Sequence, residues 1–184
     1  MIRIFAVSGS LRTVSSNTAL IRQYSELSPP GCEIDVYDRL GELPHFNPDI
    51  ADCGDKAVLD LVARVRDSHA FVVSTPEYAH GMPGTLKNCL DWLVGTDAFI
   101  EKPFALLSTS PRSIYVRASL IEVLKTMSGI HILDADVTLE LKRSTGTAEG
   151  MTSDAEVANR LADAMSVLIG YCSGNTVLIA NPKV

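Results

Sequence analysis

The chain has 184 residues, of which 46% are hydrophobic and 21% charged, and its formal net charge is −6. That length suffices for one domain with a complete hydrophobic core, and the negative charge argues against nucleic acid as the main partner. The apolar stretches fall far short of the roughly 18 residues of a membrane helix, and the N-terminal MIRIFAVSGS lacks the pattern of a secretory signal. We therefore expect one cytoplasmic domain over residues 1–184, with no membrane partner.

Apolar runs alternate with helical patterns from end to end. Strands are predicted at residues 2–7, 32–38, 70–74, 104–108 and 130–141, the last of them bent. A first helix is predicted with Leu20, Tyr24 and Leu27 on one face, and a second at residues 58–65. A third has Pro83 in its first turn, and a fourth covers residues 120–127. A fifth begins at a capping box formed by Ser153 and Glu156. The tail segment TVLIA, residues 176–180, is expected to add a strand at a sheet edge or a subunit interface.

Five strand–helix units with nearly continuous apolar strands predict an α/β fold, with a parallel sheet covered by helices on both faces. Ligands of such folds bind beyond the carboxyl ends of the strands, at the point where the strand order reverses. The loops after the first, third and fourth predicted strands are therefore the places where we expect a site.

The cysteines and histidines are dispersed along the chain. No C-x-x-C pair and no H-E-x-x-H pattern occurs among the four residues of each type. Metal ligands usually come in close pairs, and disulfide frameworks suit small secreted chains. The sequence therefore predicts no metal site and favours buried free thiols at Cys32, Cys53, Cys89 and Cys172.

The loop after the first predicted strand, Ser8–Thr18, is rich in hydrogen-bond donors. It matches neither G-x-G-x-x-G nor a Walker P-loop, but its eleven residues include six hydroxyl side chains, one arginine and no carboxylate. A helix N-terminus with a nearby guanidinium suits a phosphate group, and the short loop favours a monophosphate. The alternative is that the hydroxyls only cap the helix, but one cap needs one Ser or Thr. We favour phosphate binding.

A second unusual loop, TPEYAHGMPG at residues 75–84, follows the third predicted strand. It combines two prolines, two glycines, a glutamate, a tyrosine and a histidine, far more than a plain strand-to-helix connection needs. Prolines stiffen a turn, and glycines let backbone approach a ligand closely.

Together the two loops resemble the NADPH-dependent FMN reductase family, which includes NAD(P)H quinone and azoreductase-like flavoproteins. The family motif G-S-L-R-x-x-S-x-N is matched by Gly9, Ser10, Leu11, Arg12, Ser15 and Asn17. The motif P-E-Y-N-x-x-x-P-G-x-L-K-N-x-x-D-W is matched by Pro76, Glu77, Tyr78, Pro83, Gly84, Leu86, Lys87, Asn88, Asp91 and Trp92. The resemblance implies a flavodoxin-like fold, a five-stranded parallel sheet in the order 2-1-3-4-5, FMN as cofactor and NAD(P)H as co-substrate.

The resemblance also implies which residues bind FMN. The first motif lies on the phosphate, and the second loop lies along the isoalloxazine ring, which would explain its special backbone chemistry. The expected cofactor-binding residues are Ser10, Arg12, Ser15, Ser16, Asn17, Pro76, Glu77, Tyr78, Ala79, His80, Gly81, Ser108, Ser110 and Tyr115.

Two departures from the family pattern bear on the ring pocket. Ala79 replaces an asparagine, and Ile114 and Tyr115 stand where the loop after the fourth strand commonly has two glycines. We expect these bulkier residues to narrow or cover the pocket. For His80 a proton-transfer role is open, but a flavin carries its own chemistry, so no catalytic side chain is required.

For Glu77, Lys87, Asn88, Asp91 and Trp92 structural roles are favoured over catalysis. The sequence as a whole predicts an FMN-dependent NAD(P)H oxidoreductase that works by ping-pong transfer to a flavin, quinone, azo or metal-oxyanion acceptor. The resemblance implies a homodimer or homotetramer. The alternatives are a flavodoxin-type single-electron carrier without NAD(P)H turnover and a non-redox regulatory module.

Overall fold

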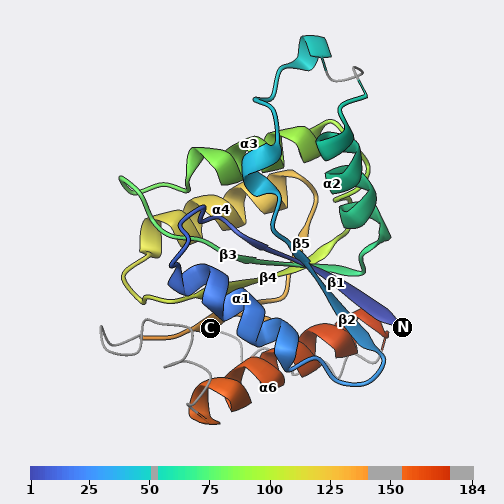
Figure 1. Cartoon of the computed structure of the whole chain (residues 1–184). Coiled ribbons are helices and arrows are strands. Elements are labelled where there is room, and N and C mark those ends of the chain that lie inside the picture. The colour runs from blue at the N-terminus through green and yellow to red at the C-terminus, as the bar shows by residue number, and fades with distance from the viewer. Residues whose placement is uncertain (51–53, 141–154, 175–184) are drawn as a thin grey trace, which may run out of the picture.

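A parallel sheet forms the centre of the molecule in the computed structural model, which describes residues 1–50, 54–140 and 155–174 (Figure 1). Its strands are β1 (Ile2–Ser8), β2 (Cys32–Tyr37), β3 (Ala70–Ser74), β4 (Pro103–Ser108), β5 (Ile130–His131) and β6 (Val137–Thr138). The order is β2-β1-β3-β4-β5, with β6 also paired to β4, and each pairing is parallel. This order confirms the predicted flavodoxin-like fold.

Helices cover both faces of the sheet, as predicted (Figure 1). They are α1 (Ser16–Glu26), α2 (Lys56–Asp67), α3 (Gly84–Val94), α4 (Ile114–Thr126) and α6 (Ala155–Cys172), with 3-10 turns η1 (Leu40–Glu42), η2 (Pro48–Ile50) and η3 (Leu133–Ala135). One core packs β1, β3 and β4 against α2, α3 and α4, and the other packs the opposite face against α1 and α6. None of the helices in the described ranges is long and apolar enough to cross a bilayer.

Helix starts differ from the sequence-based prediction at two places. Pro83 is the N-cap of α3 and lies just before its first turn. α4 begins at Ile114, six residues before the predicted start at 120, so that Ile114 and Tyr115 form the first turn of a helix and not a loop. The predicted capping residue Ser153, like Leu141, Cys53 and the tail 176–180, lies outside the described residues.

The predicted strand at 130–141 is two short strands separated by η3. β5 pairs with Pro103 and Phe104, and β6 pairs with Leu107 and Ser108. In the gap between them the backbone N–H of Leu106 donates to Asp136 Oδ1 at 2.7 Å. A side-chain carboxylate thus replaces the backbone acceptor that a continuous strand would have supplied, and this is why the strand can break.

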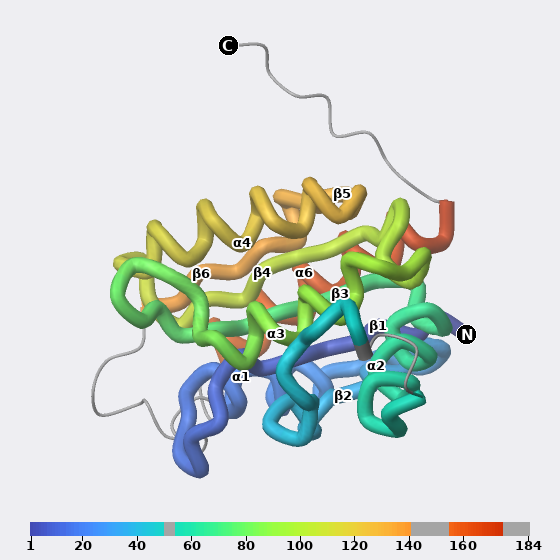
Figure 2. Tube along the Cα trace, turned by 90° about the horizontal axis from the view of Figure 1, so that it is seen from above, coloured from blue at the N-terminus to red at the C-terminus, as the bar shows by residue number. Residues whose placement is uncertain are grey.

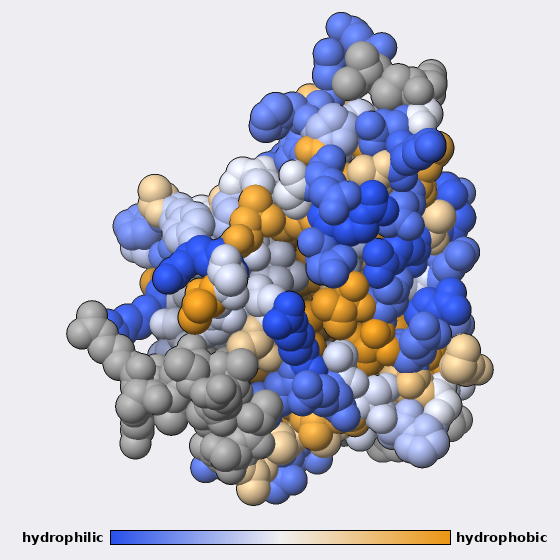
Figure 3. Space-filling model, viewed as in Figure 1, coloured by the Kyte–Doolittle hydropathy of each residue, from blue (hydrophilic) through white to orange (hydrophobic). Residues whose placement is uncertain are grey.

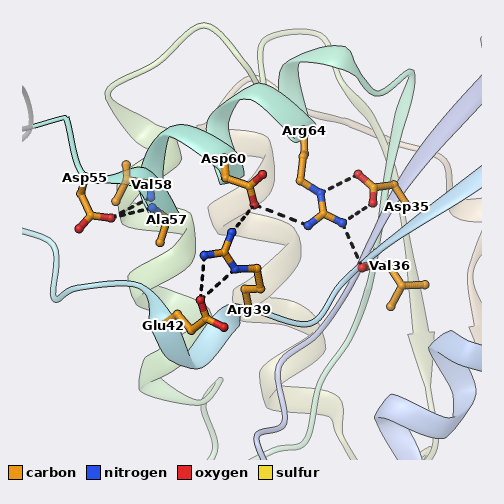
Figure 4. Close-up of polar contacts among 9 residues, drawn as sticks. All are labelled: Asp35, Val36, Arg39, Glu42, Asp55, Ala57, Val58, Asp60 and Arg64. Carbon is orange, nitrogen blue, oxygen red and sulfur yellow. Dashed lines mark hydrogen bonds and ion pairs between the residues drawn. The ribbon is translucent and has the colours of Figure 1, made fainter.

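A network of ion pairs fastens α2 and η1 to β2 (Figure 4). Arg64 binds both carboxylate oxygens of Asp35, with its Nε at 2.9 Å from Oδ2. Arg39 bridges Glu42 at 2.8 Å and Asp60 at 3.1 Å. Asp55 caps α2 by accepting from its first N–H groups. Both arginines are therefore fully engaged within the chain.

Candidate functional site

Three loops meet at the carboxyl edge of the sheet: the front loop (residues 9–15), the second loop (residues 75–83) and the loop after β4 (residues 109–113). Figure 2 shows the first two at the end of the sheet opposite the N-terminus. Parallel strands bring their carboxyl ends together, and a hydrogen bond of 2.8 Å from Gly9 N to Ser74 O joins the front loop to the end of β3 there. Of the fourteen predicted cofactor-binding residues, Ser108 is the last residue of β4, and the other thirteen lie in these loops or in the first residues of the helices that follow them.

The front loop leaves the N-terminus of α1 open to an anion. Ser15 is the N-cap and accepts from Thr18 N at 3.3 Å, and the first turn contains no acidic residue. Ser10 Oγ accepts from Arg12 N at 3.4 Å, so both hydroxyls keep their hydrogens for another acceptor. Arg12 is exposed, and no residue of the described chain forms an ion pair with it. Free donors, an unpaired guanidinium and the positive end of a helix dipole together suit a phosphate.

Asn17 has a structural role that was not predicted from the sequence. It is 5% exposed, and its Oδ1 accepts from Ser74 Oγ at 2.9 Å and from Thr109 Oγ1 at 3.5 Å. Ser16 Oγ reaches the same Thr109 hydroxyl at 3.5 Å. These contacts join α1 to the ends of β3 and β4. Sequence reasoning missed Ser74 and Thr109 because they lie 57 and 92 residues from Asn17.

The close approach of two loops accounts for Gly9. A Cβ built on Gly9 would lie 2.3 Å from Thr75 Oγ1 and 2.9 Å from Thr75 Cβ. Any side chain at Gly9 would therefore push the front loop away from the start of the second loop. This glycine serves loop packing, whereas the family motif alone suggests a cofactor contact.

The second loop contains a tight two-residue turn. Tyr78 and Gly81 exchange backbone hydrogen bonds of 2.9 Å in both directions. The two residues between them have left-handed backbone, with φ of 48° at Ala79 and 60° at His80. This is the geometry of a type I′ turn, which strongly prefers Asn and Gly. Ala79 therefore introduces strain where the family's asparagine would introduce little.

Contacts with α4 hold this turn in place. The rings of His80 and Tyr115 stack with centroids 4.0 Å apart and an interplanar angle of 21°. Glu77 Oε2 accepts from Val116 N at 2.9 Å and so caps a helix whose own N-cap, Ser113, makes no side-chain hydrogen bond. Glu77 thus has the structural role favoured from sequence, and Tyr115 contacts the second loop through His80.

Ser108 and Ser110 form the turn that leaves β4. Ser108 Oγ donates to Ser110 O at 2.9 Å and accepts from Ser110 N at 3.3 Å. Beside them a pocket of about 270 Å³, part of it open to solvent, lies between the ends of β3 and β4 and the first turns of α4. It is lined by Val73, Thr75, Leu106, Leu107, Ser108, Ser113, Val116, Arg117 and Leu120. Arg117 was not among the predicted site residues.

The remaining motif residues on α3 are structural. Asn88 Nδ2 and Trp92 Nε1 both donate to Pro44 O, at 2.9 and 2.8 Å, and Asn88 Oδ1 accepts from Phe46 N at 2.7 Å. Lys87 pairs with Asp91 along the helix. These contacts fix the segment after η1 against α3 and leave no free reactive group on this face of α3, as favoured from sequence.

Thiols in the described ranges are unpaired and shielded. Cys89 is fully buried, and burial raises its pKa to about 12. Burial likewise raises the pKa of Cys172 to about 11. Cys32 is partly buried, and its pKa is raised for the same reason. These cysteines are therefore poor nucleophiles at neutral pH. Cys89 is a buried free thiol as predicted, whereas Cys32 and Cys172 are free but only partly buried.

Comparison with known proteins identifies relatives that match the larger part of this chain. A family model described as NADPH-dependent FMN reductase matches residues 2–143. An NAD(P)H-dependent FMN reductase of Pseudomonas aeruginosa is 37% identical over 112 residues, which cover 59% of this chain and 60% of that protein. A quinone reductase of Pseudomonas putida is 36% identical over 115 residues, 60% of this chain and 61% of that protein. The chain thus matches about three fifths of the length of these two relatives.

A solved structure extends the likeness to nearly the full chain. The flavoenzyme NAD(P)H:(acceptor) oxidoreductase FerB from Paracoccus denitrificans superposes with a TM-score of 0.83 at 26% identity. The superposition covers 95% of this chain and 98% of that protein.

Proposed function

The chain belongs to the NADPH-dependent FMN reductase family, and from this premise we propose that it is an FMN-dependent NAD(P)H oxidoreductase. One observation carries the proposal: the N-terminus of α1 offers free donors and Arg12, which has no ion-pair partner among the described residues, beside loops that present aromatic side chains. The fold relatives act on NAD(P)H with FMN, quinones or other acceptors according to their names.

The residues of this chain fit FMN at two separate points. Ser10, Arg12, Ser15 and Ser16 would hold the phosphate at the start of α1, where no carboxylate opposes it. Asn17 would support that loop from the protein interior. The ring would lie along Pro76–Gly81, with Tyr115 and the Ser108–Ser110 turn beside it. The buried Arg117 Nη1 atom, which has no partner among the described residues, provides an additional donor in the adjoining pocket.

Bound FMN would supply the redox chemistry by accepting hydride from NAD(P)H and passing electrons to an acceptor. The chain itself binds and orients. The His80 ring stacks on Tyr115 and would form part of the wall of the ring pocket, so we assign no proton transfer to His80. Glu77 holds the second loop on α4.

We propose that reductant and acceptor use the same open side of the ring in turn, which gives ping-pong kinetics. Quinones are the favoured acceptors because quinone reductases are among the relatives. Free flavins, azo compounds and metal oxyanions are the further candidates. Intersecting lines in double-reciprocal plots would contradict this order.

We also propose a single cytoplasmic domain that assembles as a homodimer or homotetramer. Large apolar side chains are exposed around the site, at Leu11, Val14, Tyr78, Ile114 and Tyr115. Figure 3 shows hydrophobic residues among hydrophilic ones at the left of this face, the side on which Figure 1 shows the front loop. Apolar groups gathered around a site favour a second subunit there. Sedimentation equilibrium tests the proposed oligomeric state, and a monomer in solution would contradict it.

The decisive experiment is anaerobic mixing of the purified protein with FMN and then with NADPH or NADH. Bleaching of bound flavin supports the reductase. Bound flavin that stays oxidised supports a single-electron carrier, and failure to bind FMN supports a non-redox module. Repeating the experiment with each nucleotide gives the preference for NADPH or NADH.

A further inference from the structure

Arg117 ends in a nitrogen that lacks a partner. Its Nη2 donates to Asp136 Oδ2 at 2.6 Å, whereas its Nη1 is buried and has no hydrogen-bond partner within the described chain. A buried donor without an acceptor loses its hydrogen bonds to water without replacement, and such groups are rare in native proteins unless a ligand, ion or water meets them. The unpartnered nitrogen therefore indicates that something binds beside it.

The guanidinium is held in a fixed position. The Asp136 side chain is 5% exposed, and Leu106 N, Arg117 Nη2 and His131 Nε2 all contact its carboxylate within 2.8 Å. His131 in turn stacks on Phe104, with ring centroids 4.9 Å apart. Because Leu106 on β4 and His131 on β5 fix the Asp136 carboxylate, Arg117 is a preorganised donor and not a mobile surface cation.

The pocket that Arg117 lines is mostly apolar. Its walls include side chains of Val73, Leu106, Val116 and Leu120. Two of its hydroxyl groups already donate within the chain, Thr75 to Pro76 O at 3.3 Å and Ser108 to Ser110 O at 2.9 Å. Arg117 is the one charged residue in the lining, so it is the strongest donor that the pocket offers a ligand.

These features select a ligand chemistry. Apolar walls disfavour a hydrated ion such as free phosphate, whereas one guanidinium N–H suits a single oxygen with negative charge. A carbonyl oxygen at the edge of an aromatic ring meets both conditions, and flavins and quinones both have one. Such an oxygen gains negative charge when the ring is reduced, so a hydrogen bond from a fixed guanidinium strengthens at that moment.

We propose that Arg117, positioned by Asp136, binds a ring carbonyl oxygen in this pocket and stabilises the charge that this oxygen gains on reduction. The charge stabilisation rests on the proposed function, but the binding of a ring carbonyl does not.

The first test measures binding of lumichrome, which has the ring carbonyls of a flavin without its ribityl phosphate, to the protein free of flavin. Arg117→Met should weaken binding roughly tenfold or more, the loss expected for a charge-assisted hydrogen bond. Arg112→Met is the matched control, because Arg112 is exposed and does not line the pocket. Equal affinity of Arg117→Met and wild type, or no lumichrome binding by wild type, would overturn the proposal.

Two further variants separate binding from folding. Arg117→Lys keeps the charge but cannot contact both Asp136 and the ligand through a planar fork, so it should also lose affinity even where Arg117→Met is unstable. In Asp136→Asn the amide oxygen can still accept from Leu106 N, but the neutral amide holds Arg117 less firmly than the carboxylate does. We therefore expect a smaller loss of lumichrome affinity. Thermal midpoints measured beside the affinities show whether folding or positioning is affected. Wild-type affinity in both variants would contradict the proposed roles of the pair.

The FMN-loaded protein distinguishes the two sources of the carbonyl. If the carbonyl belongs to the flavin, Arg117→Met should bind reduced FMN less tightly relative to oxidised FMN. A tenfold loss of this relative affinity lowers the two-electron midpoint potential of the bound flavin by about 30 mV. If it belongs to a quinone, the potential is unchanged and kcat/KM falls about tenfold or more for a quinone but not for ferricyanide, which has no carbonyl. No change in either would overturn the charge stabilisation. Lumichrome binding that depends on Arg117, without NAD(P)H turnover in wild type, would refute the proposed function and leave the carbonyl site standing.

Discussion

Two helices begin at the same edge of the sheet, and their N-termini face different groups. At α1 the first turn has no acidic residue, and Arg12 in the preceding loop has no ion-pair partner among the described residues. At α4 the Glu77 carboxylate accepts from Val116 N. Both helix ends carry the same partial positive charge, but only the end of α1 is left to an outside anion. A helix N-terminus becomes an anion site when the chain keeps its own carboxylates away from it.

The largest effect on FMN affinity should come from placing a carboxylate at the N-terminus of α1, as Glu77 is placed at α4. Ser15→Asp keeps a good N-cap, so the fold should be retained, but it places a carboxylate where the phosphate would bind. Loss of a donor and the new repulsion together should lower FMN affinity by more than about a hundredfold. Fluorescence titration with FMN measures this. Riboflavin, which has no phosphate, is the control ligand and should bind as it does to wild type.

Removing the unpaired cation should have the next largest effect. Arg12→Ala removes a charge-assisted contact worth about 1.5–3 kcal/mol, or roughly ten- to over a hundredfold in FMN affinity. Arg22→Ala is the matched control, since Arg22 is an exposed arginine on α1 beyond its first turn. Unchanged FMN affinity in Arg12→Ala would remove the phosphate assignment from the front loop.

At α4 the same comparison predicts a change in stability. Glu77→Ala leaves Val116 N without its cap and should lower the free energy of unfolding by about 1–2 kcal/mol. Glu77→Gln keeps an acceptor and should lose only part of this. Urea denaturation of the three proteins measures the difference. If Gln and Ala variants were equally destabilised, the hydrogen bond to α4 would not be the source of the effect.

The smallest expected effect is a gain. Ala79→Gly removes the strain of a left-handed alanine, which outweighs the added backbone entropy of glycine. We expect the free energy of unfolding to rise by about 0.5–1 kcal/mol, which thermal denaturation would show as a higher midpoint. Ala98→Gly, at a buried alanine without positive φ, should destabilise in contrast. A lower midpoint for Ala79→Gly would show that the turn relaxes in solution.

Local sequence patterns predicted the strands, the helix faces and the three loops because each depends on residues close together in the chain, whereas the sheet order came from the family resemblance. The features that were missed depend on distant partners. The break in the edge strand arises because Asp136 bonds Leu106, thirty residues away. α4 starts early with a cap supplied by Glu77, 39 residues before Val116. Arg117 became a candidate binding residue only because the structure places its unpartnered nitrogen beside a pocket. No periodicity contains such information.

The broken strand has a consequence for how this protein behaves in a crowded solution. A long, regular outer strand offers a ladder of unpaired backbone groups to any neighbouring chain, and this is a route to fibres and aggregates. Here the border beside β4 is formed by β5 and β6, two residues each, with the 3-10 turn η3 between them. Neither strand presents enough consecutive backbone groups to template an added strand. The carboxylate of Asp136 therefore also interrupts a border along which sheets of separate molecules could otherwise join.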